Sequence, residues 1–311
     1  MNAVEPARGA RVIEELRGAA PGPTLIAIGA MHGNEPAGVG AARQVVGELG
    51  AAGGPSAGEV VALVGNVRAL AAGRRYLARD LNRQWTADRV AAARAAMAAS
   101  TAGDDETSEL AELADQLDRV IARARGPVFV LDLHTTSAAG FPFAVVGRGD
   151  DHGRFSAGLP LPGIVGLEEQ LEGVLSSYLA ARGCVALAVE GGQSQDPAAL
   201  ASLEAVVRVA LAEAGLDAPG DVAAARDHLT RARGNLPHRI EVVSRHEVRP
   251  EHGFRMEPGF ANIQRAAAGT LLARDGGGEI RAPFDGVVLL PLYQPQGSDG
   301  FFFGRELAPG E

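Results

Sequence analysis

Two histidines and one glutamate in this chain stand where they could bind a metal ion. His32 and Glu35 are three residues apart in His32-Gly33-Asn34-Glu35, directly after a run rich in Leu and Ile, and His134 ends a second apolar run. Gly33 allows the backbone to turn tightly enough for the imidazole and the carboxylate to converge. Two imidazoles and one carboxylate form a catalytic site for a divalent metal and leave a coordination position for water. We therefore predict that His32, Glu35 and His134 bind one metal ion.

Two further carboxylates could assist such a metal. Glu190 ends the apolar run 185–189 and precedes two glycines, so we expect its carboxylate in the same crevice, where it could act as a general base. From the pattern alone, Glu190 is equally well interpreted as a helix or loop cap. Asp132 lies two residues before His134, on the same side of the expected strand, where it could accept the proton of a ligand imidazole. Any one of these histidines at a strand end would by itself be interpreted as structural. The combination of His32, Glu35 and His134 instead favours a metal site.

Four arginines lie within ten positions of an otherwise acidic chain, namely Arg74, Arg75, Arg79 and Arg83. Arginine binds a carboxylate through two parallel hydrogen bonds, and beside a metal it can polarise a carbonyl and stabilise the oxyanion that forms. The cluster therefore suits a small substrate that carries a carboxylate. Without the metal ligands, the same cluster would be interpreted as a solvated loop with compensating charges.

The composition argues against several classes of protein. The 311 residues include 29 basic and 38 acidic ones, and the net charge of −9 disfavours nucleic acid and anionic membranes as partners. The single cysteine, Cys184, cannot close an intrachain disulfide or build a thiolate zinc site. Residues 1–16 lack the apolar core of a secretory signal, and no apolar run approaches the roughly 20 residues that cross a bilayer. We expect a cytoplasmic protein without a membrane span and leave its oligomeric state open.

Expected strands and helices alternate over the first two thirds of the chain. We expect strands over 23–31, 58–67, 127–134 and 184–190, and helices over 35–49, 110–124, 171–183 and 200–214. This alternation favours an α/β fold with a mostly parallel, mixed sheet and helices on both faces. In such folds the functional groups lie beyond the carboxyl ends of the strands. His32, His134 and Glu190 all stand at such ends.

The last quarter of the chain has a different pattern. Helical periodicity fades after about residue 236, and strand-like runs punctuated by Gly and Pro predict a small C-terminal all-β module, with strands over 239–243, 286–292 and 300–304. We expect an α/β domain over 1–220 and a β-rich domain over 236–311, with the boundary within 216–238. Residues 218–235 are the candidate linker, and part of them could be helical.

Four motifs occur along the chain in one order: Gly29-Ala30-Met31-His32-Gly33-Asn34-Glu35-Pro36-Ala37-Gly38, Asp80-Leu81-Asn82-Arg83, Asp132-Leu133-His134-Thr135-Thr136-Ser137 and Val189-Glu190-Gly191-Gly192-Gln193. Together they resemble the succinylglutamate desuccinylase/aspartoacylase family, which is related to the zinc carboxypeptidases. The resemblance implies a carboxypeptidase-like fold and a zinc-dependent hydrolase, a deacylase that cleaves the amide bond of an N-acylated amino acid.

The resemblance also implies a role for each matching residue. The implied ligands of one zinc ion per chain are His32, Glu35 and His134. Glu190 would be the acid/base residue. Arg75, eight residues before Arg83, resembles the arginine that polarises the scissile carbonyl, while Asn82 and Arg83 would bind the substrate carboxylate.

The sequence departs from the aspartoacylase pattern in its last part. Family members end in a β-rich domain that narrows the site entrance, and residues 282–288 are similar to turns in such modules. The C-terminal tyrosine that contacts substrate there has no match, and the run 300–304, Gly-Phe-Phe-Phe-Gly, would take its place without a hydroxyl. Arg182 aligns only with a shift to an arginine expected before the catalytic glutamate. These departures predict poor recognition of a side-chain carboxylate, as in acetylaspartate.

Three alternatives remain at this stage. A metallocarboxypeptidase that acts on peptide C-termini would use the same groups. A metal-binding or ligand-binding scaffold without turnover would need no general base, and Glu190 argues against it. Two histidines and one carboxylate also describe non-heme iron sites.

Overall fold

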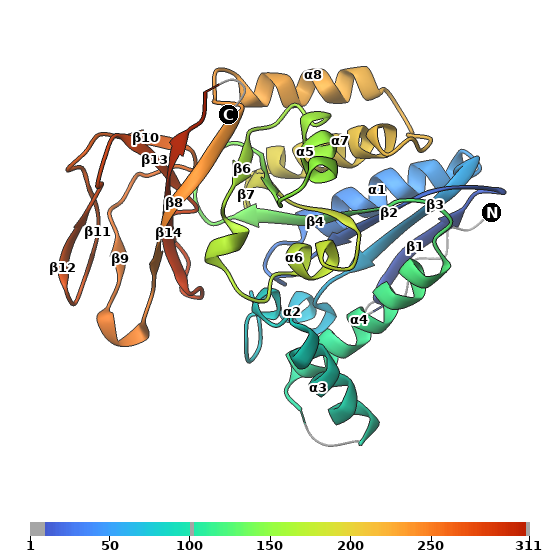
Figure 1. The fold of residues 1–311 in the computed structure, drawn as a ribbon, viewed down its shortest axis with the longest axis horizontal. Coiled ribbons are helices and arrows are strands. Elements are labelled where there is room, and N and C mark those ends of the chain that lie inside the picture. Colours follow the sequence, from blue (N-terminus) through green and yellow to red (C-terminus); the bar gives the residue numbers. More distant parts are fainter. Residues whose placement is uncertain (1–9, 100–102, 309–311) are drawn as a thin grey trace.

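The computed structural model describes residues 10–99 and 103–308, and its centre is a twisted sheet with helices on both faces (Figure 1). The sheet has eleven strands in the order β1-β3-β2-β4-β7-β5-β6-β8-β14-β13-β10. Its first seven strands are β1 (Val12–Arg17), β2 (Ala20–Gly29), β3 (Ala57–Val64), β4 (Val128–Thr136), β5 (Phe143–Val146), β6 (Gly163–Val165) and β7 (Val185–Gln193). Strands β3, β2, β4 and β7 are mutually parallel, so their carboxyl ends share one edge of the sheet.

Helices cover both faces of this parallel region, which is why its strands are apolar on both sides. One face packs against α1 (Ala37–Ala51), α5 (Asp150–Ala157), α7 (Pro197–Glu213) and α8 (Val222–Arg233), and the other against α3 (Ala87–Ala98), α4 (Asp105–Arg123) and α6 (Leu175–Ala180). In β2, Leu25 belongs to the first of these cores and the adjacent Ile26 to the second, and neither is exposed. Since successive side chains of a strand point to opposite faces, a doubly covered strand must be apolar throughout.

The late strands extend the same sheet. β8 (Arg239–Glu247) pairs with β6, and β14 (Asp299–Glu306), β13 (Gly286–Leu289) and β10 (Gln264–Ala266) follow it outward. A second sheet of three strands lies at the far end of the molecule in the order β12 (Gly278–Arg281), β11 (Leu271–Asp275), β9 (Arg255–Met256). The remaining short elements are α2 (Val67–Ala72), η1 (Leu81–Arg83), η2 (Glu168–Gln170) and η3 (Pro250–His252).

The predicted fold class is confirmed, as are the four expected parallel strands and most of the helices. The expected helix from Leu171 is wrong at its start, because α6 begins at Leu175. Gly173 has φ 71°, a left-handed conformation that interrupts a helix, and a Cβ there would lie 2.4 Å from the carbonyl oxygen of Arg83. The interruption places Leu171 in a loop beside the site instead of in a helix.

Two other segments differ from the sequence expectation. Strand β1 was not expected, and it pairs antiparallel with β3 at the edge of the sheet. Helix α8 occupies most of the candidate linker and contributes Ala225 and Leu229 to the core around α7. The division into two domains within 216–238 stays a prediction. Within the described residues, no helix is both long and apolar enough to cross a membrane.

Candidate metal centre and its pocket

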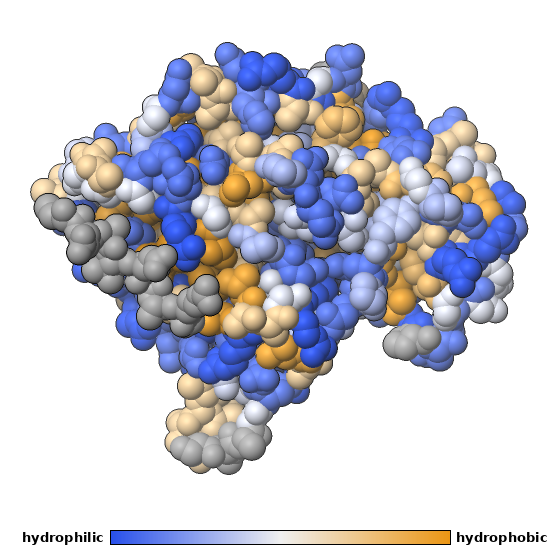
Figure 2. All heavy atoms as spheres, turned by 180° about the vertical axis from the view of Figure 1, so that it is seen from behind, coloured by the Kyte–Doolittle hydropathy of each residue, from blue (hydrophilic) through white to orange (hydrophobic). Residues whose placement is uncertain are grey.

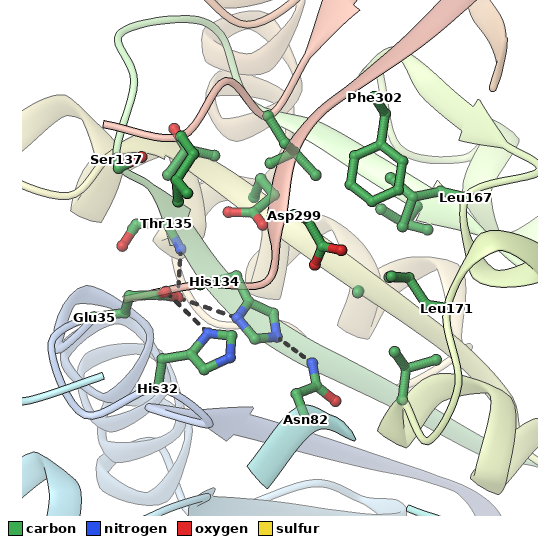
Figure 3. Close-up of a pocket in the computed structure, with 18 of the residues that line it drawn as sticks. His32, Glu35, Asn82, His134, Thr135, Ser137, Leu167, Leu171, Asp299 and Phe302 are labelled. Atoms are coloured by element: carbon green, nitrogen blue, oxygen red, sulfur yellow. Dashed lines mark hydrogen bonds and ion pairs between the residues drawn. The ribbon is translucent and has the colours of Figure 1, made fainter. Parts of the chain in front are cut away.

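Three predicted ligands from two segments meet at the carboxyl ends of β2 and β4 (Figure 3). The Glu35 carboxylate lies between two imidazoles, with Oε1 3.0 Å from Nδ1 of His32 and Oε2 3.1 Å from Nδ1 of His134. All three side chains are buried, and their potential ligand atoms lie within 4.8 Å of one another. The geometry therefore permits all three residues to bind one metal ion.

The turn after β2 is built so that His32 and Glu35 face the same point. Ala30 has φ 55°, a left-handed conformation that is unusual for a residue other than glycine and that turns the chain out of β2. A Cβ at Gly33 would lie 2.1 Å from the backbone carbon of Ala69 in α2, so only glycine fits there. The Gly33 amide donates to the carbonyl of Arg75 at 3.1 Å, which ties this turn to the loop that carries Arg75.

Each candidate histidine ligand also contacts a carboxylate through its other ring nitrogen. Nε2 of His32 lies 3.0 Å from Oδ1 of Asp80, and Nε2 of His134 lies 2.9 Å from Oδ2 of Asp132. A carboxylate on Nε2 favours the proton on that nitrogen and leaves the Nδ1 lone pair for a metal. The contact of Asp132 was expected from the sequence, whereas that of Asp80 was not. Of the motif Asp80-Leu81-Asn82-Arg83, only Asn82 and Arg83 had been given a role from the sequence.

The buried charges of this cluster shift the pKa values of its members. Burial alone would raise the pKa of Glu35, but the His32 and His134 imidazoles lower it far below its ordinary value. Burial alone would lower the pKa of His134, but Asp132 and Glu35 hold it well above the ordinary range. The pKa of Asp80 is likewise well below its usual value, because His32 and Arg75 outweigh the effect of burial. A divalent cation bound among these carboxylates would displace a proton from His134.

Arg75 stands beside the cluster on the loop between α2 and η1. Its Nη2 lies 3.0 Å from Oδ2 of Asp80, and its Nη1 lies 3.4 Å from Oε1 of Glu35. Burial alone would lower the pKa of the guanidinium, but these carboxylates raise it, so Arg75 is a fixed cation at the candidate metal centre. Arg74 and Arg79 do not line the pocket.

Glu190 lies on β7 next to His134 of β4, since the two residues are paired in the sheet register. Its Oε2 is buried and has no hydrogen-bond partner among the described residues. Burial raises the pKa of Glu190 to about 7, and the negative charge of Glu35 adds to the effect. A carboxyl group with this pKa can both accept and release a proton near neutral pH.

Asn82 and Arg83 lie on the pocket wall, but most of their polar atoms already have partners. Asn82 accepts from the Leu175 amide at 2.9 Å, and its Nδ2 lies 3.4 Å from Nε2 of His134. Nη2 of Arg83 is bound to Asp299 of β14, and Nη1 donates to the Asn82 carbonyl. The Nε of Arg83 is buried and has no hydrogen-bond partner among the described residues.

All seven predicted site residues line one cavity of about 120 Å³. Residues from the end of the chain complete the cavity, among them Leu290, Leu292, Gln294, Asp299 and Phe302. Asn34 donates to Gln294 at 3.1 Å, which joins the metal motif to the C-terminal segment. The sequence offered no signal for Asp299, whereas the run that contains Phe302 had been singled out as a departure from the family.

Glu106, which the sequence analysis did not single out, holds the loop that carries Arg75 and Asp80. Glu106 of α4 is completely buried and accepts hydrogen bonds from the backbone amides of Leu77, Ala78 and Arg79. Those amides belong to the loop between Arg75 and Asp80. A single buried carboxylate thus fixes the segment that carries both residues.

The other histidines of the chain do not line the cavity. His246 stacks between Phe254 and Phe301, and the Nε2 of His228 contacts Ser202. Among residues 10–99 and 103–308, His32, Glu35 and His134 form the one group of three side chains that could hold a metal ion.

Comparisons with known proteins agree with the expected relationship. Residues 21–190 match the model of the succinylglutamate desuccinylase/aspartoacylase catalytic domain. No curated protein matches the chain significantly.

Several solved structures share the fold over most of their length. A succinylglutamate desuccinylase from Vibrio parahaemolyticus has 14% sequence identity and a TM-score of 0.66, over 93% of this chain and 82% of that one. The product-bound ectoine utilization protein EutE from Ruegeria pomeroyi has 20% identity and a TM-score of 0.63, over 93% and 87%. A succinylglutamate desuccinylase/aspartoacylase from Rhodobacter sphaeroides has 17% identity and a TM-score of 0.66, over 94% and 88%. At these identities the likeness establishes a shared fold.

Proposed function

This chain belongs to the succinylglutamate desuccinylase/aspartoacylase family, and from that premise we propose that it is a zinc-dependent hydrolase that cleaves the amide bond of an N-acylated amino acid. The observation that carries the proposal is the meeting of His32, Glu35 and His134 in one cavity, with Glu190 on the neighbouring strand.

The donor set fits zinc. Two imidazole nitrogens and a carboxylate are a known ligand set of catalytic zinc, and both histidines carry an orienting carboxylate on the opposite nitrogen. When bound, zinc would supply a Lewis acid and lower the pKa of a water molecule to roughly 7. One zinc ion per chain is proposed.

Glu190 has the position and the pKa to move the proton in the reaction. It takes a proton from the attacking water as the water oxygen bonds to the amide carbonyl carbon, and it delivers that proton to the leaving nitrogen as the C–N bond breaks. The products are a carboxylate and an amine. The lone Oε2 of Glu190, buried and without a partner among the described residues, supports this role.

Arg75 and the pair Asn82 and Arg83 would act on the substrate. The guanidinium of Arg75, fixed by Asp80, would stabilise the negative charge that develops on the carbonyl oxygen. Asn82 and the Nε of Arg83 would bind the carboxylate of the amino acid.

The test combines metal analysis with a hydrolysis panel. Protein purified without chelator should contain about one zinc per chain, and iron in its place would overturn the metal assignment. Zinc-loaded protein should release amino acid from N-acyl amino acids faster than from peptides, and chelation should abolish the release. Faster cleavage of peptide C-termini would favour a metallocarboxypeptidase. No hydrolysis of either, with ligand binding intact in Glu190→Gln, would indicate a scaffold without turnover.

A further inference from the structure

The cavity has an apolar end on the side away from Glu35 (Figure 3). Its residues share apolar side chains and come from β5, β7, β14 and the segment between β6 and α6. We call them the apolar end: Val145, Leu167, Leu171, Val174, Ala188 and Phe302. The metal end comprises His32, Glu35 and His134.

The strand register places the apolar end directly beside the acid/base candidate. Ala188 lies two residues before Glu190 on β7, so both side chains point to the same face of the sheet. Val145 of the antiparallel neighbour β5 is paired with Ala188. The small side chain of Ala188 leaves room above the sheet, and the apolar surface therefore begins next to the Glu190 carboxylate.

The charges around the cavity disfavour a second anionic group on the substrate. Asp299 accepts from Arg245 with Oδ1 at 2.6 Å and from Arg83 with Oδ2, so its carboxylate forms an ion pair with both guanidinium groups. Glu168 also lines the cavity and accepts from the neutral hydroxyls of Ser176 and Ser177. Its negative charge stays in the wall close to the apolar end and repels another carboxylate.

An apolar group would gain from the same arrangement. Leu167 and Phe302 belong to a buried hydrophobic cluster, and Leu171 and Ala188 pack against its edge. An aliphatic or aromatic group placed on that edge would be removed from water without loss of hydrogen bonds. A carboxylate in the same place would lose its hydration, and the two arginines that line the cavity are already paired, Arg75 with Glu35 and Asp80 and Arg83 with Asp299.

We propose that the apolar end is a specificity subsite that accepts an uncharged aliphatic or aromatic group of the substrate and rejects a second carboxylate. The inference rests on the proposed function, and it names the substrate class as acylated amino acids that are neutral apart from the carboxylate of the amino acid. The apolar group belongs either to the acyl chain or to the amino-acid side chain.

Two matched pairs of compounds test the subsite. N-acetylleucine against N-acetylaspartate varies the side chain, and N-isovalerylglycine against N-succinylglycine varies the acyl chain. For zinc-loaded protein, kcat/KM should favour the apolar member of at least one pair by about 10-fold or more, and that pair identifies the half of the substrate that occupies the subsite. Preference for the acidic member in both pairs would overturn the subsite and leave the proposed function standing.

Binding separates the two proposals if hydrolysis fails. Calorimetry with the zinc-loaded Glu190→Gln variant should show the same preference, because binding does not need the acid/base group. A preference for the apolar member in binding, with no hydrolysis by the unaltered protein, would contradict the proposed function and support the subsite. Equal or tighter binding of the acidic members would overturn the subsite.

A positive charge placed at the apolar end should weaken the preference for apolar over acidic substrates. Leu171 is half-buried in a loop, so Leu171→Arg can be accommodated, and the variant should lower the apolar-to-acidic ratio of kcat/KM by about 10-fold or more. Leu200→Arg makes the same change on the exposed face of α7, outside the cavity, and should leave the ratio unchanged. An unchanged ratio in a folded Leu171→Arg variant would overturn the proposal.

Discussion

The metal end and the apolar end of the cavity are built in different ways. At the metal end, each imidazole contacts two carboxylates, and all three candidate ligands lie at or just beyond the carboxyl ends of the parallel strands β2 and β4. At the apolar end, side chains from four separate segments meet, and they hold one another by packing. The first end resists change because moving one group leaves buried charges unpaired, whereas the second can vary in shape at small cost.

This difference suggests a division between chemistry and selectivity. The groups proposed to move protons or stabilise charge come from residues 32–190, and much of the opposite wall comes from residues 290–302. Figure 2 shows one face of the molecule, on which hydrophilic residues are interspersed with apolar patches.

The largest expected effect comes from removing a charge at the metal end. Glu35→Gln keeps the shape of the side chain but removes the anion between two imidazoles, so we expect loss of bound zinc and a fall in kcat/KM of about 10³-fold or more. Asp132 contacts Nε2 of His134 and Nδ2 of Asn82 but is not a candidate ligand, so Asp132→Asn should weaken zinc affinity by only about 10–100-fold. Metal analysis and kinetics of the two variants check this order. Full zinc content in Glu35→Gln would show that Glu35 is not a ligand.

Glu190→Gln should separate catalysis from metal binding. We expect kcat to fall by about 10²–10⁴-fold with zinc content unchanged, because the variant removes the proton carrier and no proposed ligand. Loss of zinc in this variant would instead place Glu190 among the ligands.

The same variant should stabilise the metal-free protein, with a defined pH dependence. The pKa of Glu190 is about 7 in the folded protein and close to its ordinary value of 4.5 in the unfolded chain. The folded state therefore holds a proton that the unfolded state releases, and stability falls as the pH rises from about 4.5 to 7. Glu190→Gln should gain about 1–3 kcal/mol at pH 8 and much less at pH 4.5. Urea unfolding in chelator at both pH values checks this, and an equal gain at the two would contradict it.

Some residues of the cavity could be predicted from the sequence and others could not. His32, His134 and Glu190 could be placed because they end predicted parallel strands, and such ends share one edge of a sheet. Glu35 follows His32 in the same short motif, and the motifs around His134 and Glu190 are equally compact. Asp299 and Glu106 escaped prediction because each acts through contacts with residues far away in sequence, and a lone acidic residue in a strand or helix has no local signal. Leu171 was assigned to a helix because the apolar spacing continued through Gly173, which only the folded chain shows to be left-handed.

A smaller effect is expected from the residue that supports the Arg75 loop. In Glu106→Gln, one carboxylate oxygen becomes an amide that cannot accept from the backbone, so the loop should shift and kcat should fall by about 10-fold with zinc retained. Glu109→Gln is a matched control, because Glu109 is equally buried on α4 but binds the start of α2 instead. Both variants should lose stability. An equal loss of kcat in both would mean that Glu106 acts only through overall stability.

The smallest effect on turnover should follow from Asp299→Asn, since Asp299 contacts Arg83 and no group of the metal end. A neutral amide cannot neutralise both Arg83 and Arg245, so the two guanidinium groups would repel each other and Arg83 would lose its fixed position. We expect KM to rise by about 3–5-fold with kcat nearly unchanged, and stability to fall by about 1–3 kcal/mol. Glu306→Gln breaks the exposed pair with Arg265 and should leave stability nearly unchanged, because solvent screens that pair. A fall in kcat with KM unchanged would instead couple Asp299 to the metal end, and the division between chemistry and selectivity would not hold at this residue.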